Sequence, residues 1–156
     1  AKMKALLSHI GAWSPMAEQY ATAEFLNQQQ ALDNFTSAFK IKLEERLQYI
    51  YKAFTKLKEK AYPVDIITPQ AAIYLTIKID LKGYSFNGME LINQGEVSEY
   101  LLNKAHLAIV PFSCFGASAE SPWYRMSIGT CKYEELDEMF ATLEAAFAQL
   151  EPKKSV

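Results

Sequence analysis

The sequence has few cysteines, glycines and prolines, and each shortage excludes a class of protein. Among its 156 residues there are two cysteines, six glycines and six prolines. Cys114 and Cys131 are too few for a disulfide framework, so we expect two buried, reduced thiols in a cytoplasmic protein. The glycines form no phosphate-binding loop, and the G-x-S-x-G turn of serine hydrolases is absent. The chain therefore lacks the common motifs of a complete active site.

Long apolar runs and an excess of positive charge are also missing. No segment approaches the roughly 18 consecutive apolar residues that span a bilayer. The basic opening, residues 1–10, has no apolar core long enough for a secretion signal. The formal net charge is −2, so the protein has no strong positive field to attract nucleic acid or anionic lipid. We expect neither a nucleic acid nor a membrane as a partner.

Clustered metal ligands and an activated nucleophile are missing as well. His9 and His106 lie far apart in the sequence, and neither is close to a cysteine. His106 follows the end of a predicted helix, where a histidine commonly caps the last turn. A nucleophilic Cys114 would need a nearby histidine and a positive pocket, and the spacing offers neither. The sequence therefore predicts no metal site and no reactive cysteine.

What is present is the composition of an ordinary globular domain. Half of the residues are apolar and 22% are charged, and the length suits one domain with a sizeable core. The opening "AKMKALL" already has helical spacing, yet no capping residue precedes it and position 1 is not methionine. We therefore expect the chain to be a segment of a longer protein.

Four further segments have the apolar spacing of helices. Residues 14–27 form the first, with Ser14 as the N-cap and Pro15 at the first helical position. The strongest pattern runs from Asp33 to Glu59, with apolar residues three and four apart, and it stops before Pro63. A short helix is predicted over 96–106, and a closing helix over 133–150 with acidic residues in its first turn.

Four segments are typical of strands, at residues 64–67, 71–80, 107–110 and 123–129. The stretch 82–95 contains three glycines and is predicted to be a loop. Helices come first, then strands interrupted by one helix, then a closing helix. This order predicts an α+β fold, a small sheet packed on helices.

The strand at 123–129 carries an arginine at its centre. With a period of two, one face is apolar and predicted to join the core: Tyr124, Met126 and Ile128. The opposite face holds Trp123, Arg125, Ser127 and Gly129. A guanidinium there is either solvated without a ligand or placed to hold a carboxylate through two parallel hydrogen bonds, which lysine cannot do. The strand pattern alone leaves both interpretations open.

Several segments, taken in order, are similar to one known family. The segments are "LLSHIGAWSPMAEQYATAEFL", the long helix, "ITPQAAIYL", "EYLLNKAHLAIVPFSCFG" and "WYRMSIGTCKYEELDEMFATLEAAF". Together, from about Met3 to Phe147, they resemble the carboxy-terminal portion of a class I/II aminotransferase of the aspartate aminotransferase type, a fold-type I enzyme dependent on pyridoxal phosphate. The resemblance implies that residues 1–156 form the small domain of a homodimeric enzyme acting on amino acids and 2-oxo acids. Residues 1–30 would then resemble the connection from a large domain.

The resemblance gives Arg125 a role. In this family an arginine in an R-x-S strand pairs with the α-carboxylate of the substrate, and "YRMSIGT" supplies the arginine and the serine. The segment "AIVPFSCFG" is similar to a loop that lies over the substrate, so Phe115 and Gly116 are implied to line the pocket entrance. Phe112 stands where the family usually has glycine.

Other positions match or depart from the family. "GAWSP" resembles a segment that reaches toward the neighbouring subunit's active site, which implies that Trp13 and Ser14 contribute across a dimer. Ala72 replaces the glycine usual before an aromatic pair, and Ile73 replaces the first aromatic residue. Because of these departures, the resemblance does not indicate which class of side chain the substrate carries.

One part of the family's machinery has no counterpart in the sequence. The lysine that forms a Schiff base with pyridoxal phosphate lies in an S-x-x-K-like segment, which we expect upstream of residue 1. Lys2 and Lys4 are no substitutes, because they lie on the helix that follows it. The resemblance therefore implies that this chain alone has no catalytic residue, binds no cofactor and is inactive. A ligand-binding domain of a transcription regulator, or a decarboxylase or synthase on the same scaffold, are the alternatives.

Overall fold

A computed structural model describes residues 2–11, 14–129 and 131–152. Contacts along the backbone divide the chain into two compact units, residues 1–42 and 43–156. Among the described residues, no helix is both long and apolar enough to cross a membrane.

The first unit contains two short helices and the beginning of a long one. The helices are α1 (Lys2–Ile10), α2 (Met16–Leu26) and α3 (Gln29–Glu59). None of the α2 residues is buried, and the rings of Phe25 and Phe35 meet edge to face with centroids 6.2 Å apart.

Two predicted helix starts in this unit were wrong. Pro15 is the N-cap of α2 and no side chain caps it, whereas the sequence predicted Ser14. The Ser14 carbonyl instead accepts a hydrogen bond from the Gln19 side chain at 2.6 Å. The long helix begins four residues earlier than Asp33, because the Gln29 side chain donates to the Asp33 carboxylate at 2.8 Å and so supports an extra turn.

The second unit is built on a four-stranded antiparallel sheet, which makes the fold α+β, as predicted. Its strands are β1 (Val64–Ile66), β2 (Tyr74–Ile79), β5 (Val110–Pro111) and β6 (Trp123–Ser127). The order across the sheet is β1-β2-β6-β5, so β6 is an inner strand with a neighbour on each side.

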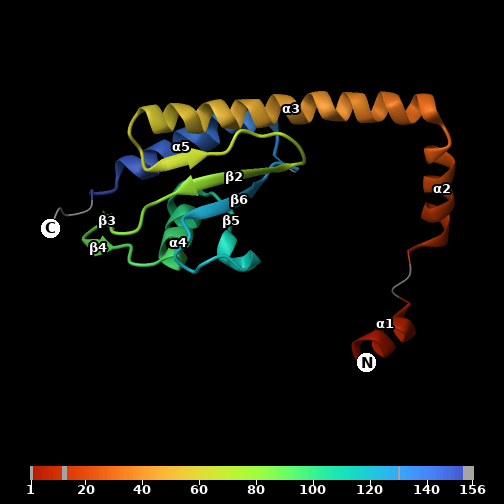
Figure 1. Ribbon diagram of the computed structural model, residues 1–156, viewed down its shortest axis with the longest axis horizontal. Coiled ribbons are helices and arrows are strands. Elements are labelled where there is room, and N and C mark those ends of the chain that lie inside the picture. The colour runs from red at the N-terminus through yellow and green to blue at the C-terminus, as the bar shows by residue number, and fades with distance from the viewer. Residues whose placement is uncertain (1, 12–13, 130, 153–156) are drawn as a thin grey trace. The chain divides into compact units, whose positions relative to one another are not determined.

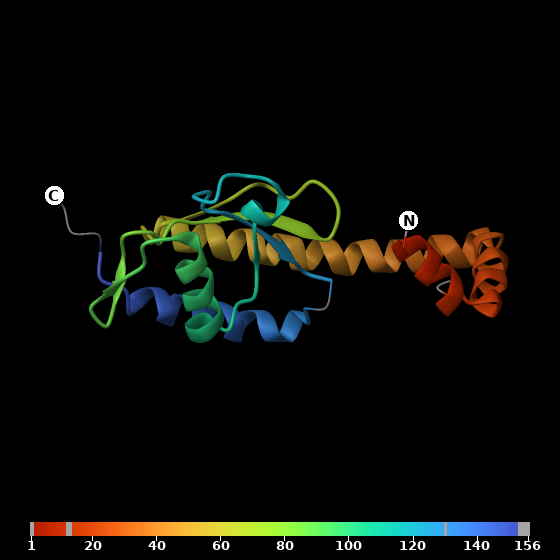
Figure 2. The same cartoon turned by 90° about the horizontal axis from the view of Figure 1, so that it is seen from below.

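One face of this sheet forms the core with three helices. The inward residues of β2 and β6 alternate with outward ones, as predicted, because successive side chains of a strand point to opposite faces. They pack against the carboxy-terminal part of α3, against α4 (Gln94–Ala105) and against α5 (Leu136–Ala148) (Figure 1). The inward residues are Leu75, Ile77, Ile79, Tyr124, Met126 and Ile128. Figure 2 shows the other face, where a short helical turn lies on the side away from α4 and α5.

Helix α4 is capped by side chains at its N-terminus and by a left-handed residue at its C-terminus. Asn93 accepts a hydrogen bond from the Glu96 backbone at 3.0 Å, and the Glu96 carboxylate accepts one from the Ile92 backbone at 2.8 Å. The helix therefore starts two residues before the predicted Glu96. His106 ends it in the left-handed conformation, φ 51°, and this C-terminal cap was predicted.

The predicted loop at 82–95 contains a small hairpin. Strands β3 (Ser85–Phe86) and β4 (Met89–Glu90) pair with each other. Between them Asn87 and Gly88 both have positive φ, 50° and 76°, as a type I′ turn requires. The prediction of a loop was wrong here, although the Asn-Gly pair is the sequence signal for such a turn.

Three further details differ from the sequence prediction. The closing helix begins with a 3₁₀ turn, η2 (Tyr133–Glu135), before α5. Of the predicted strand 107–110, only Val110 pairs, together with Pro111. Cys114 is exposed and Cys131 half-buried, so the predicted burial of the two thiols was wrong.

Candidate functional site

Arg125 lies at the centre of the inner strand β6. It is directly opposite Thr76 on β2 and Val110 on β5, so its backbone is held from both sides. Its neighbours Tyr124 and Met126 are buried at 0% and 4% exposure, whereas Arg125 itself is half-buried. The strand therefore directs the guanidinium to the face of the sheet opposite the core, as the period-two pattern predicted.

Two aromatic rings contact this guanidinium. Its central carbon Cζ lies 4.5 Å from the ring centroid of Tyr74 and 4.4 Å from that of Phe115. Both distances are typical of cation–π contacts, in which the positive charge sits over the negative face of the ring. Tyr74 comes from β2, and Phe115 comes from η1 (Phe112–Phe115), the short helical turn that follows β5.

The guanidinium has no acidic partner in the part of the chain that the structure describes. The ion pairs there join lysines to carboxylates, and Arg125 takes part in none of them. Its side chain also donates no hydrogen bond to a described residue. Arginine carries five N–H donors in one plane. This half-buried cation can therefore bind a planar anion such as a carboxylate without first breaking an ion pair among these residues.

The loop predicted to line a pocket entrance does approach Arg125, through one residue. Phe115 contacts the guanidinium, as described above, and Phe112 meets the Phe115 ring edge to face with centroids 6.3 Å apart. Gly116 ends the turn with φ 89°, a backbone conformation that favours glycine. Its backbone N–H bonds back to the carbonyls of Phe112 and Ser113. Gly116 shapes the turn that carries Phe115.

The roles predicted for Trp13 and Ser14 across a dimer stay predictions. Trp13 lies outside the described residues. Ser14 is exposed in the first unit, and its carbonyl accepts the Gln19 side chain.

Other groups with potential chemistry are dispersed. Among the described residues, no three His, Cys, Asp or Glu side chains gather in a way that could hold a metal ion. Both cysteines are free, and burial raises the pKa of the Cys131 thiol, which disfavours the reactive thiolate. The lysines in the described ranges are all at least partly exposed.

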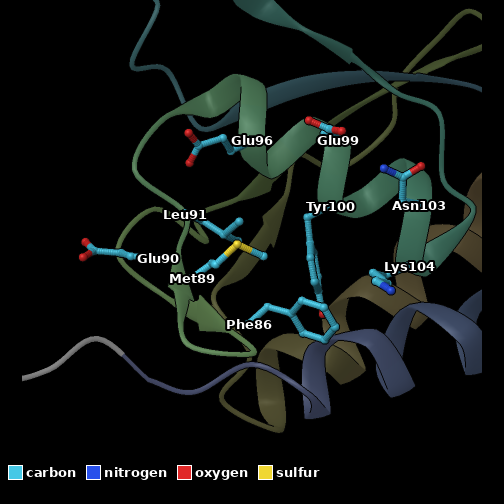
Figure 3. Close-up of a pocket in the computed structure, with 9 residues that line it drawn as sticks. All are labelled: Phe86, Met89, Glu90, Leu91, Glu96, Glu99, Tyr100, Asn103 and Lys104. Carbon is cyan, nitrogen blue, oxygen red and sulfur yellow. The ribbon is translucent and has the colours of Figure 1, made fainter.

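A separate cavity of about 530 Å³ lies between the β3–β4 hairpin and α4 (Figure 3). Tyr100 extends from α4 toward Phe86 on the hairpin, and the two ring centroids are 5.3 Å apart. Two polar side chains of this cavity already serve the fold: the Tyr100 hydroxyl donates to the Ala146 carbonyl at 2.7 Å, and Glu96 caps α4. This cavity shares no residue with the surroundings of Arg125.

Sequence reasoning missed Tyr74 as a neighbour of Arg125. A strand at 71–80 was predicted, but its pairing with the strand at 123–129 was not. In the observed register Tyr74 lies opposite Ser127 and Thr76 opposite Arg125, so Tyr74 and Arg125 are diagonal neighbours on one face. Only the order of strands in the sheet could have revealed this contact.

The chain is similar to a known protein family and to a curated relative. The family model described as "Aminotransferase class I and II" matches residues 2–143. A curated relative, the "Probable aspartate/prephenate aminotransferase" of Rickettsia felis, is 32% identical over 106 residues. That match covers 67% of this chain and 25% of the relative.

Solved structures are similar over most of the chain. The aspartate aminotransferase from Rhizobium meliloti has a TM-score of 0.62 and 26% identity, over 75% of this chain and 28% of that one. The aromatic aminotransferase from Pyrococcus horikoshii OT3 has a TM-score of 0.65 and 25% identity, over 83% and 31% of the two chains. The chain thus spans about a quarter to a third of the length of these relatives.

Proposed function

Because the chain belongs to the class I and II aminotransferase family, we propose that it is the carboxy-terminal small domain of a pyridoxal-phosphate-dependent aminotransferase. The complete enzyme would transfer an amino group between an amino acid and a 2-oxo acid in two half-reactions. The observation that carries the proposal is Arg125, a half-buried guanidinium that contacts two rings and has no acidic partner among the described residues.

In this proposal Arg125 binds the α-carboxylate that amino acids and 2-oxo acids share. A guanidinium offers two parallel N–H groups to the two carboxylate oxygens, which fixes the position and the plane of the substrate. Holding the substrate in this way favours reaction, because the reacting atom is then placed before the chemical step. The rings of Tyr74 and Phe115 keep water from part of the cation and so strengthen its attraction for an anion.

The cofactor itself does not fit the described residues. Pyridoxal phosphate supplies the electron sink for amino transfer, and it is held through a buried lysine amine of lowered pKa. Every described lysine is at least partly exposed, so none of them provides that amine. We therefore propose that the cofactor binds elsewhere in the complete protein and that this chain alone binds no cofactor and is inactive.

The proposal extends to assembly and location. Many large apolar side chains are exposed in the first unit, among them Met3 at 72% and Phe35 at 62%. Apolar surface of this extent is typical of an interface. We expect the rest of the protein or a second subunit to cover this surface, and the complete enzyme to be a homodimer.

Because both cysteines are free, we expect the protein to work in the cytoplasm.

The test is the substitution Arg125→Ala in the complete aminotransferase that contains this chain. Loss of the bidentate hydrogen bonds between the guanidinium and the carboxylate should raise the KM for the amino acid and lower kcat/KM by about 100-fold or more. Arg46→Ala is the matched control, because Arg46 is the other arginine in the sequence and lies on α3. We expect it to change kcat/KM by no more than about twofold.

Near-normal kinetics in Arg125→Ala would contradict the proposal. Equal losses in the two arginine variants would contradict it too, because they would indicate a general effect of removing positive charge.

A further inference from the structure

The two rings around Arg125 approach it from different elements. Tyr74 stands on the outward face of β2, diagonal to Arg125 on β6, so the sheet itself fixes the distance between them. Phe115 is carried over the sheet by η1, which follows β5, the other neighbour of β6. The strands on both sides of Arg125 therefore each supply one ring, directly or through the turn that follows.

The two rings contact the guanidinium separately and do not stack on each other. Each ring centroid is within 4.5 Å of Cζ, yet the described rings of Tyr74 and Phe115 make no ring contact with each other. Two rings this close to one carbon can avoid each other only by approaching it from different sides. Each ring therefore covers a different part of the guanidinium.

A third ring supports this arrangement. Phe112 meets Phe115 edge to face, with the ring planes at 88° and the centroids 6.3 Å apart. Phe112 is half-buried, whereas Phe115 is 54% exposed. The less exposed ring thus packs against the more exposed one and restricts its movement over Arg125.

We propose that Tyr74 and Phe115 are positioning residues that hold the Arg125 guanidinium in the plane in which its N–H edge meets the substrate carboxylate. Arginine side chains lose much rotational freedom on binding, so a guanidinium fixed beforehand binds its anion more tightly. This inference rests on the proposed function, because the rings act only through Arg125.

The experiment uses the complete aminotransferase with Tyr74→Leu and Phe115→Leu, each made both in the wild type and in Arg125→Ala. Leucine keeps apolar bulk but removes the ring face. In the wild-type background, each change should raise the KM for the amino acid about threefold to thirtyfold and leave kcat within about twofold. In Arg125→Ala the same changes should alter kcat/KM by less than about twofold, because the group they position is gone.

Conservative variants separate positioning from folding. Tyr74→Phe and Phe115→Tyr keep the rings, so both should restore KM to within about twofold of the wild type. Thermal unfolding of every variant checks that the sheet is intact. The inference would be overturned if a leucine variant unfolds at a lower temperature than the wild type and the aromatic variant at the same position shows the same rise in KM.

Two results separate this inference from the proposed function. If Arg125→Ala lowers kcat/KM but the leucine variants keep the wild-type KM, the inference is wrong and the proposed function stands. Losses of equal size in the wild-type and Arg125→Ala backgrounds would also overturn the inference. If Arg125→Ala itself has no effect, the proposed function fails first.

Discussion

Tyr49 and Asp137 form a contact between α3 and α5 that makes stability depend on pH. The Tyr49 hydroxyl donates a hydrogen bond to the Asp137 carboxylate. This bond, with smaller contributions from burial and from the charge of Asp137, raises the pKa of Tyr49 from 10.0 to about 12. Burial raises the pKa of Tyr124 to about 12 as well. Both residues resist losing their proton in the folded state.

The raised pKa values predict a loss of stability at high pH. Between about pH 10 and 12 the unfolded chain loses these protons while the folded chain keeps them, so the free energy of unfolding falls as pH rises. Below pH 10 the contribution is fully present. In Tyr49→Phe, the fall in urea midpoint between pH 9 and pH 11 should therefore be smaller than in the wild type, with the part due to Tyr124 remaining.

The exposed Tyr20 on α2 supplies the control for this measurement. The urea midpoint of Tyr20→Phe should fall between pH 9 and pH 11 as steeply as that of the wild type. An unchanged slope in Tyr49→Phe would show that the Asp137 contact does not hold the proton.

At this scale the strand pattern identified Arg125 but not the rings that contact it. A period of two along 123–129 separates Arg125 from Tyr124 and Met126, because side-chain direction in a strand depends on local geometry. The contacts with Tyr74 and Phe115 depend on which strands are neighbours and on where η1 lies. Those are long-range properties, which local spacing does not contain.

At the scale of elements, the segment just before β2 contains a strained residue. Ala72 has φ 64°, in the left-handed region that side chains other than glycine rarely adopt. It lies two residues before Tyr74, at the position where the family usually has glycine. The β2 approach therefore keeps the glycine-type backbone although the glycine is replaced.

Replacing Ala72 by glycine should stabilise the protein. The substitution removes a left-handed penalty of roughly 1–2 kcal/mol and adds some freedom to the unfolded chain, for a net gain of about 0.5–1 kcal/mol. Ala141→Gly is the matched control of opposite sign, since Ala141 is an exposed residue inside α5 and glycine there should cost about 0.5–1 kcal/mol. Urea unfolding of the two variants checks both signs, and a loss of stability in Ala72→Gly would contradict this account of the turn.

Elements with long, regular patterns were the predictable ones. The long helix was expected over 33–59 and is observed over 29–59, because its apolar spacing continues for many turns. The β3–β4 hairpin was missed because its strands have two residues each, too few for a period to appear. Its Asn87-Gly88 turn was the available signal.

For the whole molecule, the central claim is that this chain carries the substrate-binding half of a divided site. It spans about a quarter to a third of the relatives that it matches. Its sheet holds Arg125 on the face opposite the core, and no described lysine has the burial that the cofactor requires. The proposed carboxylate-binding role of Arg125 depends on one pair of charges, and an experiment can remove the charge of the arginine or that of the substrate.

The most direct test of that claim removes the negative charge of the substrate and the positive charge of Arg125, separately and together. The kcat/KM for an amino acid and for its α-carboxamide would be measured with the complete wild-type enzyme and with Arg125→Ala. The wild type should prefer the carboxylate by about 100-fold or more, and the variant by less than about threefold, because the group that distinguishes the two substrates is gone. An equal preference for the carboxylate in both enzymes would contradict the account.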